Sequence, residues 1–416
     1  MNRRKGVTKM NTRYLIVADD FTGSNDTGVQ LRRRGYPTEV IFAGNVPSED
    51  KSVVIDTESR TVSSDQAYDM VCNALKGMEF SGFRYVIKKV DSTIRGNIPQ
   101  EIRAMDEALK PDLIVFAPAL PGLGRTTING VQRLNGVEIC QTELSKDPRN
   151  PVEEDHLVKL LAKEYQEPVI LKELAEIRSG GLSFENNRVF VCDAETDADL
   201  KNIIKAAQET EKTVLYIGTA GIADNLMEME SPSLPALGVV ASISTVTNRQ
   251  MHYCEEKGYT MVKVPVHEIL TEESRMSQYR DMAIAALRRG EDTILLTSTS
   301  YNREEMEMSQ KAGEEKGMSL TDTGEYVRSM IGRTAKEILE AVPVSGVFLT
   351  GGDTALGVME SIEAAGTEIL SEILTGIPMV RAKGGMFDGL KLVTKAGAFG
   401  GDDAAAFAMR KIKEKM

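Results

Sequence analysis

The sequence predicts an α/β protein with two domains, each built on a mainly parallel sheet that helices flank. Short apolar runs alternate with amphipathic segments along almost the whole chain, as in successive βα units. Several of these runs end in glycine and hydroxyl residues, which is typical of a strand that turns directly into a helix. The chain has 416 residues, enough for two domains of ordinary size. Both sheets are therefore expected to be Rossmann-like, with ligands at the carboxyl ends of the strands.

Composition excludes several classes of protein. Hydrophobic residues make up 41% of the chain, and 35 glycines accompany them, so a full core is expected. The formal net charge of −12 argues against nucleic acid or an anionic membrane as a general partner. No apolar run approaches the roughly 18 residues that a membrane helix needs, and the first apolar run is too short for a signal peptide. We therefore expect a cytoplasmic protein.

The cysteines and histidines show no pattern of a metal site. The four cysteines are widely spaced without a CxxC pair, and the three histidines lack any ligand spacing. Buried thiols are the simpler explanation of the cysteines in apolar segments. We assign no metal-ligating residue.

In the N-terminal half, the pattern predicts a strand over 14–18, a polar turn over 22–25 and a helix over 26–34 that Gly35 ends. Later strands are expected at 39–43, 53–56, 84–90, 112–117, 169–171, 188–192 and 213–217. Later helices are expected at 65–75, 99–109, 156–165 and 197–210. The glycine-rich segment 118–131 and the proline-rich segment 142–152 are expected to be loops.

The segment Ser-Pro-Ser-Leu-Pro at 231–235 is the best candidate for a boundary between domains. Beyond it, strands are expected at 238–241, 261–266, 293–297, 345–349 and 390–394. Helices are expected at 248–257, 272–289, 303–341, 355–365 and from 404 to the C-terminus. We expect a poorly ordered N-terminus over 1–12, domains over 13–230 and 238–416, and a linker over 231–237.

Two adjacent carboxylates, Asp19 and Asp20, follow the first apolar run. Together with the small polar residues behind them, they indicate a binding site, because ligands lie at the carboxyl ends of such strands. Capping of the next helix would explain one of the two carboxylates. Arg60 follows the strand at 53–56 in the same way. Its planar fork suits a carboxylate ligand, and a solvated surface charge is the alternative.

Charged and hydroxyl residues also cluster after the strand at 84–90. They are Lys88, Lys89, Asp91, Ser92, Thr93 and Arg95. Because side chains alternate along a strand, at most one of Lys88 and Lys89 can face a cleft at this strand end.

Two glycine-rich turns, at 351–354 and 397–400, each lie between a predicted strand and a helix. Such turns let backbone N–H groups approach a phosphate at a helix N-terminus. A third turn, at 242–247, is rich in serine and threonine. Close packing of strand and helix is the alternative, and the pattern alone does not decide between the two. The sequence contains neither GxxxxGK[ST] nor GxGxxG, which disfavours a P-loop and a dinucleotide site.

Seven segments, in order along nearly the whole chain, resemble the motifs of the four-carbon acid sugar kinases, a family formerly catalogued as a domain of unknown function. They are ADDFTGSNDTG (18–28), DTESR (56–60), KKVDSTIRGNI (88–98), GRTTINGVQRLNGV (124–137), DPRNP (147–151), FLTGGDTA (348–355) and TKAGAFG (394–400). The resemblance implies an N-terminal sugar-acid domain, a C-terminal nucleotide domain and an active site in the interdomain cleft. It also implies ATP and Mg²⁺, and phosphorylation of the C4 hydroxyl of a four-carbon sugar acid. D-threonate is the expected substrate, with D-erythronate and 3-oxo-tetronate as alternatives.

The resemblance also assigns residues. The sugar acid would contact Asp20, Arg60, Lys89, Val90, Asp91, Ser92 and Thr93. The nucleotide would contact Ser242, Ser244, Gly351, Gly352, Asp353, Thr354, Ala396, Gly397, Ala398, Phe399 and Gly400. Many relatives carry Glu where this chain has Asp353, and Asn where it has Ala398.

Asp20 and Asp91 are the candidate catalytic bases, and we favour Asp20 because it ends the first strand. Arg60 is assigned to the substrate carboxylate. Partners are therefore a small sugar acid and ATP, and a homodimer is considered. A two-domain binding protein for an anionic metabolite, without catalysis, is the alternative function. A dinucleotide-dependent dehydrogenase is disfavoured by the missing fingerprint.

Overall fold

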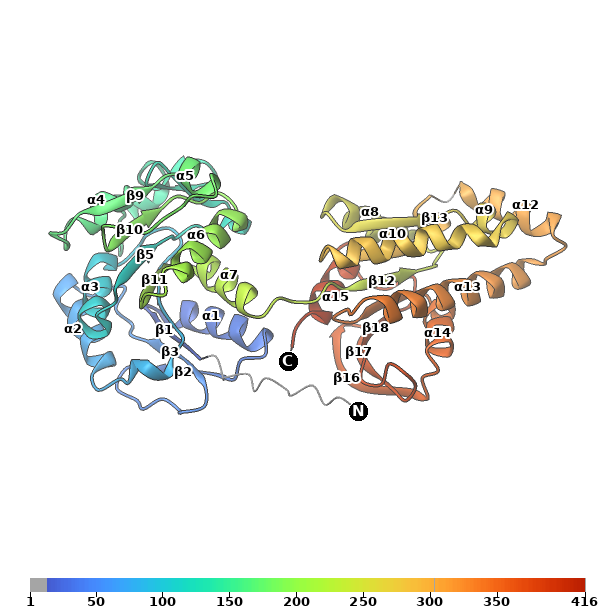
Figure 1. Cartoon of the computed structure of the whole chain (residues 1–416), viewed down its shortest axis with the longest axis horizontal. Helices are drawn as coiled ribbons and strands as arrows, with labels where there is room; N and C mark the ends of the chain where they lie inside the picture. The colour runs from blue at the N-terminus through green and yellow to red at the C-terminus, as the bar shows by residue number, and fades with distance from the viewer. Residues whose placement is uncertain (1–12, 303, 416) are drawn as a thin grey trace. The chain divides into compact units, whose positions relative to one another are not determined.

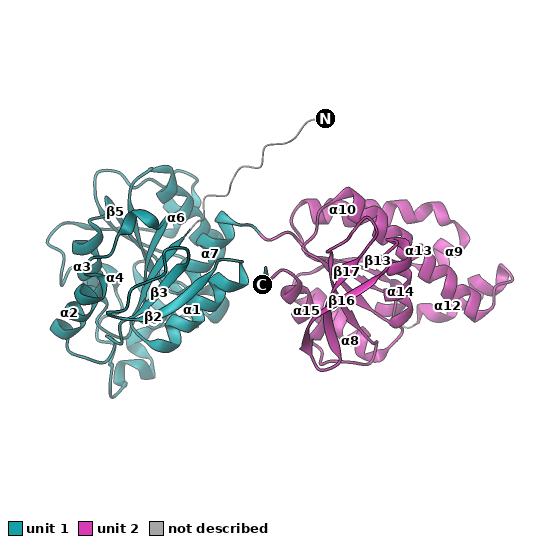
Figure 2. Ribbon diagram, turned by 90° about the horizontal axis from the view of Figure 1, so that it is seen from below, with its two compact units in different colours: residues 1–232, 415–416 teal, residues 233–414 magenta. Residues whose placement is uncertain are grey.

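The computed structural model describes residues 13–302 and 304–415, which form two compact units (Figure 2). Residues 13–232 with Lys415 belong to the first unit, and Ser233–Glu414 form the second. The segment 1–12, expected to be poorly ordered, lies outside the described residues. Within the described ranges, no helix is both long and apolar enough to cross a membrane.

The first unit is built on an eight-stranded sheet in the order β2-β3-β1-β4-β11-β5-β10-β9 (Figure 1). Every pair of neighbouring strands in this sheet is parallel, so all carboxyl ends share one edge. The strands are β1 (Tyr14–Ala18), β2 (Thr38–Phe42), β3 (Ser52–Asp56), β4 (Tyr85–Lys89), β5 (Leu113–Phe116), β9 (Val169–Lys172), β10 (Val189–Cys192) and β11 (Val214–Gly218). The connections run outward from β1 in both directions, and ligands bind at such a switch point in open α/β sheets.

Helices cover both faces of this sheet. They are α1 (Phe21–Arg33), α2 (Ser64–Leu75), α3 (Ile98–Leu109), α4 (Leu157–Leu161), α5 (Leu174–Arg178), α6 (Asp197–Glu209) and α7 (Ala220–Glu230). Alternate residues of β1 belong to opposite apolar clusters: Ile16 packs with the cluster of α1, α6 and α7, and Val17 with that of α2, α3 and α4. The sheet is therefore buried on both sides, as parallel sheets are.

The first helix begins earlier than predicted. The expected turn at 22–25 is wrong, because α1 starts at Phe21. Asp20 caps the helix by accepting a hydrogen bond from the amide of Gly23 at 3.1 Å. Ser24 and Thr27 donate their hydroxyls to carbonyls four residues back, at 2.8 and 2.9 Å, so the polar residues fit inside the helix. Helix α4 is also shorter than the predicted 156–165.

The predicted loop over 118–131 is wrong as well. Its second half enters a three-stranded antiparallel sheet formed by β6 (Arg125–Ile128), β7 (Val131–Leu134) and β8 (Val137–Glu138). Two-residue Asn-Gly turns at 129–130 and 135–136 join these strands, and all four turn residues have positive φ. Asn-Gly between β-branched or apolar residues is a strong hairpin pattern, so the sequence carried this information.

The second unit contains a seven-stranded sheet in the order β13-β14-β12-β15-β18-β17-β16. Its strands are β12 (Leu237–Val240), β13 (Thr260–Val264), β14 (Thr293–Thr297), β15 (Val347–Thr350), β16 (Gly366–Leu374), β17 (Ile377–Lys383) and β18 (Lys391–Lys395). The first five strands in this order are parallel, and β17 and β16 add an antiparallel hairpin. The hairpin was not predicted, whereas two mainly parallel sheets with flanking helices confirm the predicted fold class.

The helices of the second unit are α8 (Thr245–Glu256), α9 (Val266–Thr271), α10 (Met276–Arg288), α11 (Ser298–Tyr301), α12 (Glu305–Glu315), α13 (Leu320–Ala341), α14 (Gly352–Ser361) and α15 (Ala404–Ile412). The single helix predicted over 303–341 is wrong, because Gly317 has a positive φ of 72° and Ser319 caps a new helix. Ser319 forms a capping box with Asp322, which fixes the start of α13. The predicted helix at 272–289 is likewise shorter as α10.

Candidate functional site

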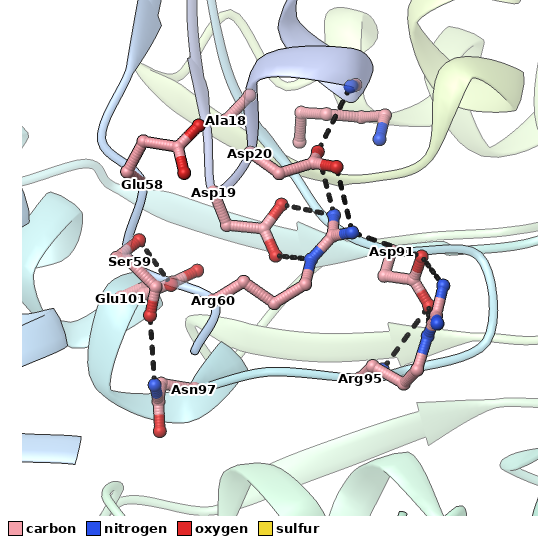
Figure 3. A network of polar contacts seen from close by, with 12 residues as sticks. Ala18, Asp19, Asp20, Glu58, Ser59, Arg60, Asp91, Arg95, Asn97 and Glu101 are labelled. Atoms are coloured by element: carbon pink, nitrogen blue, oxygen red, sulfur yellow. Dashed lines mark hydrogen bonds and ion pairs between the residues drawn. The ribbon is translucent and has the colours of Figure 1, made fainter. Parts of the chain in front are cut away.

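The first unit gathers three aspartates around Arg60 at the carboxyl edge of its sheet (Figure 3). Asp19 accepts from Arg60 Nε at 2.7 Å and Nη2 at 2.9 Å. Asp20 Oδ2 accepts from Nη1 at 2.9 Å, and its Oδ1 lies 2.8 Å from Nη2. Asp91 Oδ1 lies 3.8 Å from Nη1. The strand order β3-β1-β4 brings the three segments together, since each follows one of these neighbouring strands.

Arg60 is therefore not a solvated surface charge, but its guanidinium is already in contact with carboxylates of the protein. Asp19 is 1% exposed and occupies the Nε–Nη2 edge of the guanidinium. Burial alone would raise the pKa of Asp19, yet the hydrogen bonds from Arg60 and the charge of Lys88 hold it below its ordinary value. The geometry makes Arg60 the group that orients two aspartates, rather than an open receptor for a substrate carboxylate.

Lys88 and Lys89 point to opposite sides of β4, as the alternation along a strand requires. Lys88 is fully buried and pairs with Glu101 at 2.8 Å. Lys89 lies on the side of α1. A Cβ built on Gly23 would be 2.5 Å from Asp20 Oδ1 and 3.0 Å from Lys89 Nζ. Burial lowers the pKa of Lys89, and Asp19 and Asp20 partly oppose that shift.

Asp91 is saturated with hydrogen bonds. It accepts from Arg95 Nε and Nη2, each at 3.0 Å, and from the amide of Thr93 at 3.1 Å, and the Thr93 hydroxyl also donates to it. Burial would raise the pKa of Asp91, but the bonds from Arg95 and Thr93 outweigh it and keep the pKa below its ordinary value. Such a carboxylate is a weak base.

Two other predicted residues take a limited part in this cluster. The side chain of Val90 is buried in an apolar cluster, so only its backbone can meet a ligand, and its amide already donates to Gly218 O at 2.9 Å. Ser92 is half-buried, and its carbonyl accepts from Gln132 Nε2 at 3.1 Å.

Sequence reasoning missed the residues that hold the segment of Arg60 in place. Asn97 Nδ2 donates to the carbonyl of Ser59 at 3.0 Å (Figure 3). It also donates to the carbonyl of Val62 at 2.9 Å. Ser59 Oγ donates to Glu101 at 2.6 Å. Burial also raises the pKa of Asp56, at the end of β3, to about 6. The only sign of these residues in the sequence was that they lie inside the motifs at 56–60 and 88–98 or, for Glu101, just beyond the second of them.

In the second unit, the three predicted nucleotide turns meet at the carboxyl ends of the neighbouring strands β12, β15 and β18. A Cβ built on Gly397 would lie 2.5 Å from Ser242 Oγ and 3.1 Å from Ser244 Cβ. A Cβ on Gly351 would lie 3.8 Å from Ser242 Cβ. Gly351 also has a φ of 100°, a conformation that favours glycine. Close approach and backbone conformation thus explain these two glycines.

Interior side chains hold the carbonyls of the turn at 396–401. Lys395 Nζ donates to Ala396 O and Gly397 O, each at 3.0 Å, and Thr247 Oγ1 donates to Gly397 O at 3.0 Å. Gln250 Nε2 donates to Phe399 O at 3.0 Å and to Gly401 O at 2.8 Å. Sequence reasoning missed all three donors. Burial also lowers the pKa of Lys395 to about 8.

The amides near these carbonyls are left available. Those of Gly397, Ala398 and Gly400 have no acceptor within residues 13–302 and 304–415. At the start of α14, no side chain of the described residues caps the helix, so its first amides are available too. We call the amides of 352–354, 397, 398 and 400 the donor cradle; the amide of Phe399 is not part of it, because it donates to Ala396 O at 3.1 Å. Such a group of N–H donors binds phosphate.

Asp353 and Ala398, the two departures from the family pattern, are both exposed beside the donor cradle. In the described part of the chain, no group of three or more His, Cys, Asp or Glu could hold a metal ion. Asp353 and the Thr354 hydroxyl nevertheless fit Mg²⁺ as it is usually bound, by one or two carboxylates together with phosphate oxygens.

The fold and the two clusters are typical of a class of proteins that bind a hydroxylated anion in one unit and phosphate groups in the other. Comparison with known families agrees. Residues 14–226 match the family described as the sugar-binding N-terminal domain, and residues 237–405 match the nucleotide-binding C-terminal domain.

Individual relatives identify the family. The chain is 36% identical to a D-threonate kinase of Salmonella typhimurium, across 97% of this chain and 99% of the relative. It is 27% identical to a D-erythronate kinase of Heliobacterium modesticaldum, across 94% and 95%. A crystal structure from Bordetella bronchiseptica, titled as a domain of unknown function, is similar with a TM-score of 0.61 and 27% identity, across 96% and 98%. The chain belongs to the four-carbon acid sugar kinase family.

Proposed function

We propose that the protein is an ATP-dependent kinase that phosphorylates the C4 hydroxyl of D-threonate. The observation that carries this proposal is that one unit contains an aspartate–arginine–lysine cluster and the other contains a donor cradle. Kinases of four-carbon sugar acids are the named activities of the relatives, and D-threonate belongs to the one at 36% identity. D-erythronate and 3-oxo-tetronate are the alternative substrates, because relatives at 27% and 26% identity carry those names.

Asp20 is the proposed general base. Its side chain is 25% exposed, whereas Asp19 is buried against Arg60 and Asp91 is saturated by Arg95 and Thr93. Asp20 would accept the proton of the C4 hydroxyl while O4 bonds to the γ-phosphorus and ADP leaves. Arg60 holds the carboxylate of Asp20 through two contacts, so the base is oriented before the substrate arrives.

The substrate carboxylate needs a cation other than Arg60. Lys89 lies beside Asp20, and the side chain of Arg95 is 31% exposed although its guanidinium contacts Asp91 and lies 3.8 Å from Asp147. We assign the carboxylate to these two cations, and the substrate hydroxyls to the hydroxyl and carboxylate groups around them. The similar Bordetella structure was solved with bound citrate, itself a hydroxylated carboxylate, which supports a ligand of this chemistry.

The donor cradle is proposed to bind the phosphates of ATP. Backbone N–H groups would stabilise the charge that phosphoryl transfer shifts toward ADP. Mg²⁺, when bound, would neutralise phosphate charge, and Asp353, in the first turn of α14, is the protein carboxylate proposed to hold it. The domain bounds with a linker over 231–237, and an active site in the interdomain cleft, stay predictions. A homodimer is also proposed, because the Bordetella relative was solved as a domain-swapped dimer.

The test is turnover by the purified full-length chain. ADP release would be measured with ATP, Mg²⁺ and D-threonate, L-threonate, D-erythronate or 3-oxo-tetronate in turn. Phosphorus NMR would then identify the phosphorylated carbon. We expect D-threonate to give the highest kcat/KM and a 4-phosphate. Tight binding of these acids without ADP release would instead support the binding protein, and a preferred substrate other than D-threonate would replace the specific assignment.

A further inference from the structure

The second unit contains a cavity of about 320 Å³ beside the donor cradle. Residues that follow β12, β13, β14 and β15 form its floor, and α12 and α13 form its walls. Its apolar lining consists mainly of Ile243, Val266, Met306, Leu320 and Val327.

Two residues of the apolar lining are open to solvent, whereas Val266 is buried and Met306 and Val327 are half-buried. Leu320 is 68% exposed and Ile243 is 55% exposed, although both are large aliphatic residues. A single exposed leucine is ordinary, but two large exposed aliphatic side chains that line the same cavity indicate a surface that a ligand covers. The cavity also lies within the usual size range of small-molecule sites.

The cavity is continuous with the proposed phosphate site. Asp353 and Thr354 line it and also belong to the first turn of α14, whose free amides form part of the donor cradle. A molecule with its phosphates on the cradle would therefore extend its other end into the cavity. That end is expected to carry no negative charge, because Arg328, the one cationic side chain among the described residues that line the cavity, is already paired with Glu360 at 2.7 Å.

A small number of polar groups accompany the aliphatic lining. Thr299 Oγ1 donates to Thr297 Oγ1 at 3.1 Å, and both threonines face the cavity. Gln310 and Thr323 add an amide and a hydroxyl on the wall. Apolar faces with a few hydrogen-bonding groups at the edge suit a nucleobase, whereas a four-carbon sugar acid carries a hydroxyl or carboxylate oxygen on every carbon.

We propose that this cavity holds the nucleobase of the nucleotide, packed between aliphatic side chains of α12, α13 and the turn at Ile243. The inference rests on the proposed nucleotide site and extends it. It predicts that part of the affinity for ATP comes from the base, independently of the phosphates.

Calorimetry with two probes separates the contribution of the base to the affinity from that of the phosphates. The probes are MgATP and magnesium tripolyphosphate, each titrated into the full-length protein. Val327→Trp fills the cavity and should weaken MgATP binding by at least tenfold, while tripolyphosphate changes less than twofold. Met306→Ala removes one aliphatic contact and should weaken MgATP by about three- to tenfold. Met308→Ala is the matched control, because Met308 is exposed on the same helix but does not line the cavity.

Three outcomes would overturn the inference. The first is a wild-type protein that binds tripolyphosphate as tightly as MgATP, because the base would then contribute nothing. The second is an equal loss of both probes in a folded Val327→Trp protein. The third is equal MgATP affinity in Met306→Ala and Met308→Ala, which decides the matter even if the tryptophan variant does not fold. Binding of neither probe by the wild type would instead mean that the nucleotide site itself is wrong.

Discussion

Replacing Arg60 by lysine tests the role that the structure gives this residue. The guanidinium contacts both carboxylates: Asp19 through Nε and Nη2, and Asp20 through Nη1 and Nη2. A lysine ammonium keeps the charge, but it cannot span both carboxylates in one plane. The carboxylate of Asp20 should therefore lose its fixed orientation.

The expected loss follows from the contacts. A charge-assisted hydrogen bond is worth about 1.5–3 kcal/mol, and the variant loses at least one of those that orient Asp20. Because about 1.4 kcal/mol corresponds to a tenfold rate, kcat/KM should fall by roughly ten- to a hundredfold. The fall should appear mainly in kcat, since the damaged group is the base.

Comparing a charged with a neutral substrate distinguishes the two roles considered for Arg60. The assay compares D-threonate with threitol, a neutral analogue that lacks the carboxylate and is expected to be a poor substrate. If Arg60 orients Asp20, both substrates should lose activity in the same proportion. A much smaller loss with threitol would refute this reasoning and return Arg60 to the substrate carboxylate. Arg103→Lys serves as a control, because Arg103 pairs with Glu164 and contacts none of the three aspartates.

Three further predictions concern single groups. Asp20→Asn should lower kcat by at least a hundredfold and change the Kd of ATP less than twofold. The control Asp69→Asn, at an exposed position, should change neither value. Near-normal turnover of Asp20→Asn would exclude Asp20 as the base. Gly397→Val should abolish ATP binding measured by calorimetry and leave sugar-acid binding intact. The control Gly366→Val, at a position where an added Cβ meets open space, should bind ATP normally. Unchanged ATP affinity in Gly397→Val would mean that the turn has only a structural role. The pKa of Lys395 is lowered to about 8 by burial, so at about pH 8.5 the amine is mostly neutral, and a bound triphosphate should raise its pKa and draw in a fraction of a proton. Calorimetry in buffers of different ionisation enthalpy should detect that uptake in the wild type and not in Lys395→Met; equal uptake in both would assign the proton to another group.

The sequence by itself determined the order of the parallel strands along the chain and the strand ends that polar or glycine-rich residues follow. Apolar runs of four or five residues ending in Asp19-Asp20 or in glycine-rich turns are local patterns, and the strands β1, β3, β4, β15 and β18 formed close to where they were expected. The Asn-Gly turns of β6 to β8 were equally local, so that hairpin could have been predicted. The β16–β17 hairpin is harder to predict, because β16 is mostly exposed and carries little apolar alternation.

Only the tertiary structure decided which strand ends are neighbours. Arg60 reaches Asp19 and Asp20, about 40 positions away, because β3 lies beside β1. Gln250 holds the carbonyl of Gly401, 151 positions away, because α8 packs against the turn that follows β18. Hydrogen bonds of this kind depend on sheet order and helix packing, which no local pattern encodes. The sequence therefore placed the reactive groups at strand ends, while the packing of the sheets determined that Arg60 holds the aspartates and that interior side chains hold the donor cradle.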